Sequence, residues 1–269
     1  MTEAFYLPDG NDLIATELTR GPWDAGSQHA GPPAALLGRA IERLPDAADF
    51  HVGRVSIEIL APVPIGLMTT EARVIRPGRR VQLLEASLRA DGKEVMRAAA
   101  WRLRITPVEV EPADPPPQAP RVGPEHGQEK DFFATGETVG YHTAMEYRFI
   151  EGGFLELGSA IVWMRMRQPL IAGEEPTPLQ HVLTAADSGN GVSATLDLSR
   201  YLFINVDLTV HLERMPVDEW VCLEAITLPQ ETGAGTADTL LSDRDGRIGR
   251  ALQTLLIAER DPGSSTDGD

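Results

Sequence analysis

A proline-rich stretch divides this chain almost in the middle and limits what it can fold into. Residues 107–124, PVEVEPADPPPQAPRVGP, contain seven prolines and no apolar periodicity. Because proline fixes φ and lacks a backbone N–H, this stretch can form neither a helix nor a central strand, and we expect it to run extended over the surface. The chain is therefore predicted to have an N-terminal domain (1–106), a linker (107–130), a C-terminal domain (131–260) and a disordered tail (261–269).

The same order of elements recurs on both sides of this stretch. Each half has a Gly/Pro-rich loop and then a short Ala- and Leu-rich segment beginning at proline, PAALLGRAIERL at 33–44 and PLQHVLTAADSG at 178–189. Proline is tolerated in the first turn of a helix, and a helix that is apolar on most of its surface belongs inside a protein. An alternating strand follows each helix, RVSIEILAP at 54–62 and NVDLTVHLE at 205–213, with an offset of 151 residues.

A hairpin signal ends each half. Two long strand patterns meet at Asp91-Gly92 in the first half and at Asp245-Gly246 in the second, with an offset of 154 residues. The slightly larger offset corresponds to a small insertion. We interpret the pattern as an internal duplication of an α+β unit, in which an antiparallel sheet wraps around a central helix.

Composition excludes several classes of function. The 269 residues suffice for two domains with cores of their own, and the net charge of −16 disfavours nucleic acid as a partner. No apolar run approaches the ~20 residues of a membrane-spanning helix, and the first residues, MTEAFYLPDGND, lack the features of a secretory signal. The single cysteine, Cys222, cannot form an intramolecular disulfide. We expect a cytoplasmic protein with no membrane partner, no metal and no cofactor of its own.

Several motifs in this order resemble the double-hotdog acyl-CoA thioesterases, specifically relatives of the bacterial acyl-CoA thioesterase II. They are QHAGPPAALLGRAIE and RVSIEILAPVPIG in the first half, and HVLTAADSGNG, INVDLTVHLER and GRALQTLLI in the second. The resemblance implies a tandem (double) hotdog fold, a role in lipid metabolism, and hydrolysis of an acyl-CoA thioester to free acid and CoA. Coenzyme A then enters only as part of the substrate. We further expect assembly through sheet edges into a homodimer or higher homo-oligomer.

The resemblance also implies catalytic residues. In that family an aspartate, a threonine and a glutamine of the C-terminal hotdog position the attacking water, and these match Asp187, Asn205 and Gln253. Asn205 departs from the pattern, because an amide can hold a water but lacks the proton-sharing hydroxyl. This departure favours the alternative function, a non-catalytic acyl-CoA-binding or scaffold protein on the same fold.

The residues also carry predictions of their own. Asp187 follows Leu179 and Leu183 at helical spacing, so it is either a carboxylate on an apolar helix face, which must be paired, or a solvated helix end. Gln253 shares strand parity with Leu255 and is predicted to point inward, where it bonds either the site or backbone.

The other assignments rest on strand parity and on the repeat. At the 154 offset the counterpart of Gln253 is Ala99, which parity with Trp101 and Leu103 also places inside. Asn205 lies on the polar side of its strand, so it can face the site only because it stands at the start of that strand. Thr209 could supply the missing hydroxyl instead, but its parity gives it no better access. In the first half, the positions that correspond to Asp187, Asn205 and Gln253 hold Glu42, Arg54 and Ala99. The first half therefore lacks a matching catalytic set, and we expect one site per chain.

Two further groups are candidates for binding the substrate. A backbone N–H at the start of the first helix, from Ala30 or Gly31, is the expected oxyanion donor, with His29 at the mouth. His29 can equally be a loop residue that caps or packs. The basic cluster RPGRR, with Arg76, Arg79 and Arg80, is either a contact for the anionic coenzyme or a solvated turn.

Overall fold

The computed structural model describes residues 3–111, 122–133 and 135–260. The first half contains strands β1 (Tyr6–Asp9), β2 (Asp12–Ala15), β3 (Phe50–Ile59), β4 (Leu67–Arg76), β5 (Val81–Ala90) and β6 (Lys93–Arg104), helix α1 (Gly31–Glu42), and the 3-10 turns η1 (Glu17–Thr19) and η2 (Ala47–Asp49). The second half contains η3 (Pro124–His126), α2 (Tyr141–Ala144), β7 (Met145–Gly153), β8 (Glu156–Met166), α3 (Pro178–Ala186), α4 (Gly189–Val192), β9 (Tyr201–Asn205), β10 (Asp207–Leu212), β11 (Val221–Pro229), β12 (Ala234–Asp243) and β13 (Gly246–Glu259).

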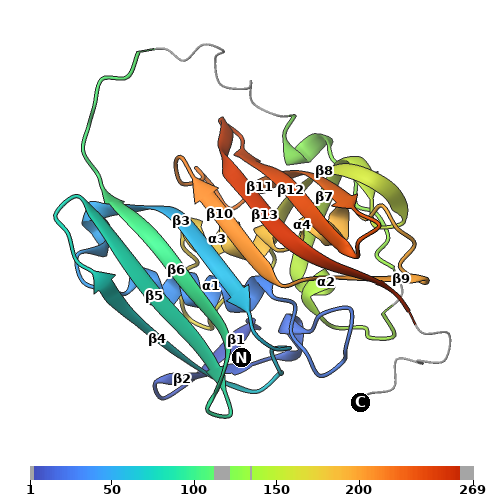
Figure 1. Cartoon of the computed structure of the whole chain (residues 1–269), viewed down its shortest axis with the longest axis horizontal. Helices are drawn as coiled ribbons and strands as arrows, with labels where there is room; N and C mark the ends of the chain where they lie inside the picture. Colours follow the sequence, from blue (N-terminus) through green and yellow to red (C-terminus); the bar gives the residue numbers. More distant parts are fainter. Residues whose placement is uncertain (1–2, 112–121, 134, 261–269) are drawn as a thin grey trace.

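The strands form one continuous antiparallel sheet. Its order is β1-β2-β4-β5-β6-β3-β10-β13-β12-β11-β8-β7, and β9 pairs with β13 off this path. The two halves meet where β3 pairs with β10, with Val55 opposite Val210. Figure 1 shows the sheet curving across the molecule with α1 and α3 behind it. The predicted antiparallel sheet with few helices is confirmed, and the single sheet is consistent with two hotdog units joined edge to edge.

Helices α1 and α3 pack antiparallel against each other beneath this sheet. Gly38, in the middle of α1, is so close to α3 that an added Cβ would lie 2.6 Å from Leu183 Cδ1. Gly31, at the start of α1, is as close to the end of α3, where an added Cβ would lie 2.4 Å from Thr184 O. At the other end of the pair, Glu42 contacts Thr177. Each helix start therefore lies beside the other helix's end.

Helix α3 is shorter than the sequence pattern suggests. It ends at Ala186, and Asp187 is its C-cap residue. Its start agrees with the prediction, because Pro178 occupies the first turn and Thr177 Oγ1 accepts a hydrogen bond from Gln180 N–H at 3.3 Å. The residues after Ala186 turn into the short α4, which places Asp187 at a junction between two helices.

The predicted inner face of β6 is wrong. Ala98, Ala100 and Arg102 are the buried residues, whereas Leu103 is 44% exposed and Ala99 does not belong to the buried set. Burial alternates regularly from Met96 to Arg102, so the strand has the expected period and only the choice of its inner face was wrong.

Arg102 can occupy the inner face of β6 because its guanidinium is well contacted there. It stacks 4.8 Å from the centroid of the Phe50 ring. Its Nε donates to Gln82 Oε1 and its Nη2 to Pro45 O, both at 2.7 Å.

The end of the predicted linker packs on the C-terminal half. Trp163 Nε1 donates to Val122 O at 2.6 Å, and Gln128 exchanges backbone hydrogen bonds with Phe149. Residues 112–121 of the predicted linker and the predicted tail at 261–269 lie outside the described residues. None of the helices in the described ranges is long and apolar enough to cross a membrane.

The glycines at the helix contact generate a stability prediction. Gly31→Ala pushes a Cβ against the backbone carbonyl of Thr184, which cannot move without moving α3, so we expect a loss of about 1–3 kcal/mol in the free energy of unfolding. Gly38→Ala meets only the end of the Leu183 side chain and gains helix propensity, so its loss should be smaller. Urea unfolding of both variants measures the difference; a Gly38→Ala loss equal to or larger than that of Gly31→Ala would contradict this packing.

Glu42 generates a second stability prediction. Its Oε2 accepts from Thr177 Oγ1 at 2.7 Å and from Gln180 Nε2 at 3.2 Å, and burial raises the pKa of this carboxyl despite both bonds. An acid whose pKa is higher in the folded protein opposes folding once it is ionised, and this cost vanishes below the pKa of the unfolded chain, about 4.3. Glu42→Gln should therefore raise the urea midpoint at pH 7 and leave it unchanged at pH 3. An equal gain at both pH values would show that charge is not the cause.

Candidate active site

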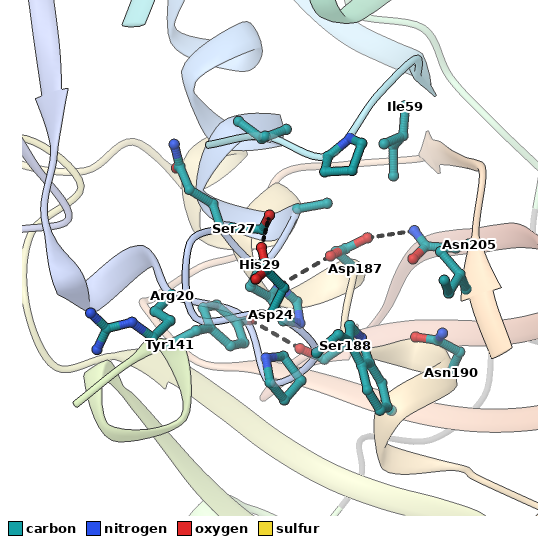
Figure 2. Close-up of a pocket in the computed structure, with 18 of the residues that line it drawn as sticks. Arg20, Asp24, Ser27, His29, Ile59, Tyr141, Asp187, Ser188, Asn190 and Asn205 are labelled. Atoms are coloured by element: carbon teal, nitrogen blue, oxygen red, sulfur yellow. Dashed lines mark hydrogen bonds and ion pairs between the residues drawn. The ribbon is translucent and has the colours of Figure 1, made fainter. Parts of the chain in front are cut away.

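Four side chains from distant parts of the chain meet where the end of α3 lies beside the start of α1. Asp187 caps α3, His29 comes from the loop before α1, Asn205 ends β9 and Gln253 lies in β13. Asp187 is 4% exposed and Gln253 is 1% exposed. In Figure 2, Asp187 points between His29 and Asn205. The structure thus brings together the three catalytic residues predicted from the sequence and adds His29 to them.

The Asp187 carboxylate is surrounded by hydrogen-bond donors. Its Oδ1 accepts from Asn205 Nδ2 at 2.8 Å and from Gln253 Nε2 at 3.3 Å, while its Oδ2 lies 3.0 Å from His29 Nδ1. A buried carboxylate is stable only when such partners replace water. The alternative interpretation of Asp187 as a solvated helix end is therefore wrong.

Gln253 supports Asp187 from the side away from the open space. Its Nε2 also donates to the backbone carbonyl of Asp187 at 3.0 Å, and its Oε1 accepts from Asn190 N–H at 3.1 Å. Gly189 allows this approach, because an added Cβ there would lie 3.0 Å from Gln253 Oε1 and 2.6 Å from Thr239 Oγ1. The predicted burial of Gln253 is confirmed, and its amide is engaged at both ends in holding the junction between α3 and α4.

Asn205 reaches the site because its strand is interrupted. β9 ends at Asn205 and pairs with β13, and β10 begins at Asp207 and pairs with both β13 and β3. Alternation with Leu208 and Val210 predicts that Val206, between the two strands, faces inward, but it is 45% exposed, so this prediction is wrong. Thr209 lies farther along β10, where its Oγ1 donates to Ser56 Oγ at 3.2 Å, and it does not line the cavity beside Asp187.

His29 uses one nitrogen for two contacts. Its Nδ1 lies 3.0 Å from Asp187 Oδ2 and also accepts from Gly31 N–H at 3.1 Å. A single imidazole nitrogen either donates or accepts, so the two contacts exclude each other. When Nδ1 carries a proton it binds Asp187 and the Gly31 N–H is released.

Tyr141 is a residue of this site that the sequence did not reveal. Its ring stacks on His29 with centroids 3.7 Å apart and planes at 10°. Its hydroxyl donates to Thr184 O at 2.7 Å and lies 3.0 Å from Ser188 Oγ, and burial raises the pKa of this hydroxyl. The one-turn helix α2 that carries it has no periodic pattern, so only its tertiary contacts show its place.

The start of α1 presents backbone donors to the same site. Ala30 lines the cavity, and within the described chain its N–H has no hydrogen-bond acceptor. Pro32 and Pro33 have no N–H, so only Ala30 and Gly31 carry donors at this helix start. Gly31 does not line the cavity, and its N–H donates to His29 Nδ1.

A cavity of about 600 Å³ opens in front of Asp187 and Asn205. Arg20, Asp24 and Ser27 give it a polar edge. An aromatic wall lies along another side, where the rings of Phe132 and Phe133 stack with centroids 4.2 Å apart and Phe154 meets Phe132 edge-on at 4.5 Å. The space is polar at Asp187 and apolar beyond it, as a site for an amphiphilic ligand requires.

The remaining predicted binding residues lie elsewhere. Arg76, Arg79 and Arg80 surround the turn between β4 and β5, at the end of the sheet opposite Ile59, and they do not line this cavity. Arg20, which does line it, is held by Glu17 and Glu137. Among the described residues, no group of three or more His, Cys, Asp or Glu side chains is arranged to hold a metal ion.

Comparisons with known proteins agree with this architecture. Residues 19–103 match the model for the acyl-CoA thioesterase N-terminal domain, and residues 107–257 match the model for the acyl-CoA thioesterase C-terminal domain. No curated protein matches the chain.

Three solved structures with the same fold cover nearly the whole chain. A protein of Thermobifida fusca, named as a candidate thioesterase II, has a TM-score of 0.73 at 17% identity, covering 94% of this chain and 95% of its own. A hot dog fold protein of unknown function from Alicyclobacillus acidocaldarius has a TM-score of 0.69 at 16% identity, covering 96% of both chains. The acyl-CoA thioesterase II of Mycobacterium marinum has a TM-score of 0.63 at 13% identity, covering 96% and 95%.

At these identities the solved structures establish the fold, and the family models, one of which spans more than half of the sequence, establish the ancestry. The chain belongs to the acyl-CoA thioesterase family.

Proposed function

We propose that this protein is a double-hotdog thioesterase that hydrolyses an acyl-CoA to free acid and CoA at a single site in front of Asp187. The observation that carries the proposal is a buried carboxylate, 4% exposed, that faces a cavity of about 600 Å³ and is held by donors from three other elements. Thioester hydrolysis needs a positioned base, an oxyanion donor and an apolar space for the acyl chain. Each of these has a candidate at this site.

The base is Asp187, with Asn205 beside it. Because Asn205 Nδ2 donates to Asp187, its carbonyl oxygen is free to accept from a water that also donates to the carboxylate. The water oxygen attacks the thioester carbon while Asp187 takes its proton. The tetrahedral intermediate then collapses, the C–S bond breaks, and CoA leaves as a thiolate that recovers a proton.

The oxyanion donors are the N–H groups of Ala30 and Gly31. His29 controls the second of them, because protonated Nδ1 bonds Asp187 and leaves the Gly31 N–H free for the developing negative charge. The stacked ring of Tyr141 holds the imidazole in the plane in which Nδ1 can bond either Asp187 or the Gly31 N–H.

Gln253 is a positioning residue in this mechanism. Its amide bonds the Asp187 carboxylate, the Asp187 carbonyl and Asn190 N–H, and it does not line the cavity. It therefore fixes the direction of the carboxylate and does not itself touch the water.

The alternative is a non-catalytic acyl-CoA-binding or scaffold protein. Asn205 favours it, because a hydroxyl is missing where the family has threonine. The two functions differ in one measurement, which is the release of free thiol from acyl-CoAs of graded chain length. Saturable binding without release for every chain length would support the alternative. Assembly into a homo-oligomer and a cytoplasmic location stay predictions.

The first prediction for activity concerns the base. Asp187→Asn keeps the size of the side chain and removes its basicity, so thiol release should fall about 10²- to 10⁴-fold. Acyl-CoA binding should persist, because the apolar cavity is unchanged. Thiol release and binding are measured on the same preparation; a variant that retains the full rate would refute the assignment of Asp187.

The second prediction separates the two amide residues. Asn205→Ala removes a side chain that lines the cavity, so kcat should fall with little change in Tm. Gln253→Ala leaves the buried Asn190 N–H without its acceptor, so kcat and stability should both fall, the latter by about 1–3 kcal/mol. Kinetics and thermal unfolding of the two variants test this contrast. Equal Tm losses would mean that Gln253 does not hold the α3–α4 junction.

A further inference from the structure

A second cavity lies at the opposite end of the helix pair. At the active site the end of α3 meets the start of α1; here the end of α1, at Glu42, meets the start of α3, at Thr177. The cavity has a volume of about 280 Å³. The duplication therefore leaves a concave space at both ends of the pair, with different side chains in each.

The second cavity holds a buried cation that has no salt-bridge partner among the described residues. Arg102 lines it and is 2% exposed. Its Nε and Nη2 are bonded to uncharged acceptors on Gln82 and Pro45, and its Nη1 has no hydrogen-bond partner. The Asp46 carboxylate is close enough to interact with it electrostatically, but no carboxylate of the described chain forms a salt bridge or a hydrogen bond with it. An unpaired buried charge is costly, and so is an unsatisfied donor, so this guanidinium is suited to an anion that the chain does not supply.

Glu42 does not neutralise Arg102, although it lines the same cavity. Its carboxylate bonds are to Thr177 and Gln180, and burial raises the pKa of the carboxyl, which disfavours its charged form. Much of the remaining lining is apolar, from Ile41, Val52, Leu179 and Met215. The cavity thus combines one unpaired cation with an apolar wall.

This end of the pair lacks the groups of the active site. The start of α3 is already capped, since Thr177 Oγ1 accepts from Gln180 N–H and Pro178 has no N–H. The lining contains Val52 and Arg102 from β3 and β6, and no amide side chain. A second hydrolytic site is therefore not what this cavity offers.

We propose that this cavity binds a small monocarboxylate, with its carboxylate on Arg102 and its short apolar body against Val52, Leu179 and Met215. The volume lies just below the range of about 300–1,000 Å³ that holds drug-sized ligands, so the ligand is short. Monocarboxylates are also the acids that the proposed reaction would release. The binding itself does not depend on that reaction, because it uses none of the residues around Asp187.

The test is titration calorimetry with butyrate, and with butyramide as the uncharged control of the same shape. It is run on the wild-type protein and in the Asp187→Asn background, so that binding at the first cavity is recognised. We expect saturable butyrate binding that persists in Asp187→Asn, and at least tenfold weaker binding of butyramide. The same dissociation constant for butyrate and butyramide would overturn the role of Arg102.

Two variants locate the ligand. Arg102→Met should weaken butyrate binding at least tenfold. Because Arg102 also has structural hydrogen bonds, Ala48→Trp provides a second route: Ala48 is exposed at the edge of the cavity, and a larger ring there closes it without removing a charge. Ala234→Trp, at an exposed position outside both cavities, is the matched control. Butyrate binding that survives Ala48→Trp, or that is lost equally in Ala234→Trp, would refute the site.

Discussion

The close antiparallel contact between α1 and α3 determines where every functional group lies. Gly31 permits it, because an added Cβ there would collide with the Thr184 carbonyl, and Gly38 brings the middle of α1 against the Leu183 side chain. As a result the loop before α1 is fixed beside Asp187, and Glu42 is fixed beside Thr177. The sheet adds the strands that cover both ends. Neither half alone could form the site, since His29 belongs to the first half while Asp187, Asn205 and Gln253 belong to the second.

The same contact explains how a carboxylate can be buried at the end of a helix. The last carbonyls of a helix carry partial negative charge, so Asp187 is unfavourable there on electrostatic grounds. Donors from β9, β13 and the loop before α1 offset that cost, and Gln253 binds both the carboxylate and the Asp187 carbonyl. Because Tyr141 bonds the Thr184 carbonyl and stacks on His29, it connects the same helix end to the imidazole. The carboxylate therefore faces the cavity in a fixed direction before any ligand enters.

Much of this arrangement could be predicted from local patterns, and the failures have physical causes. Proline in the linker, apolar helices, Asp-Gly turns and strand parity are local signals, and they predicted two similar α+β units and the burial of Gln253. The choice of Asp187 came from the family resemblance, because local signals left a solvated helix end equally open. The wrong face of β6 was predicted at Ala99 because Arg102 is stacked inside on Phe50, which residue polarity cannot show. Strand parity failed at Val206 because the strand breaks there. The place of Tyr141 beside His29 follows from tertiary structure alone. The same is true of the position of Arg76, which does not line the cavity.

The two ends of the helix pair have diverged in the sign of their buried charge. At one end a carboxylate is surrounded by donors from its own chain, so it is stable without a ligand. At the other end a guanidinium has only neutral acceptors for two of its nitrogens and none for the third. A group whose partners are complete can be used for catalysis, because its geometry is fixed. A group whose partners are incomplete gains most from binding, since the ligand supplies the missing interaction. The two ends of the helix pair therefore differ in how completely the chain itself satisfies the buried charge.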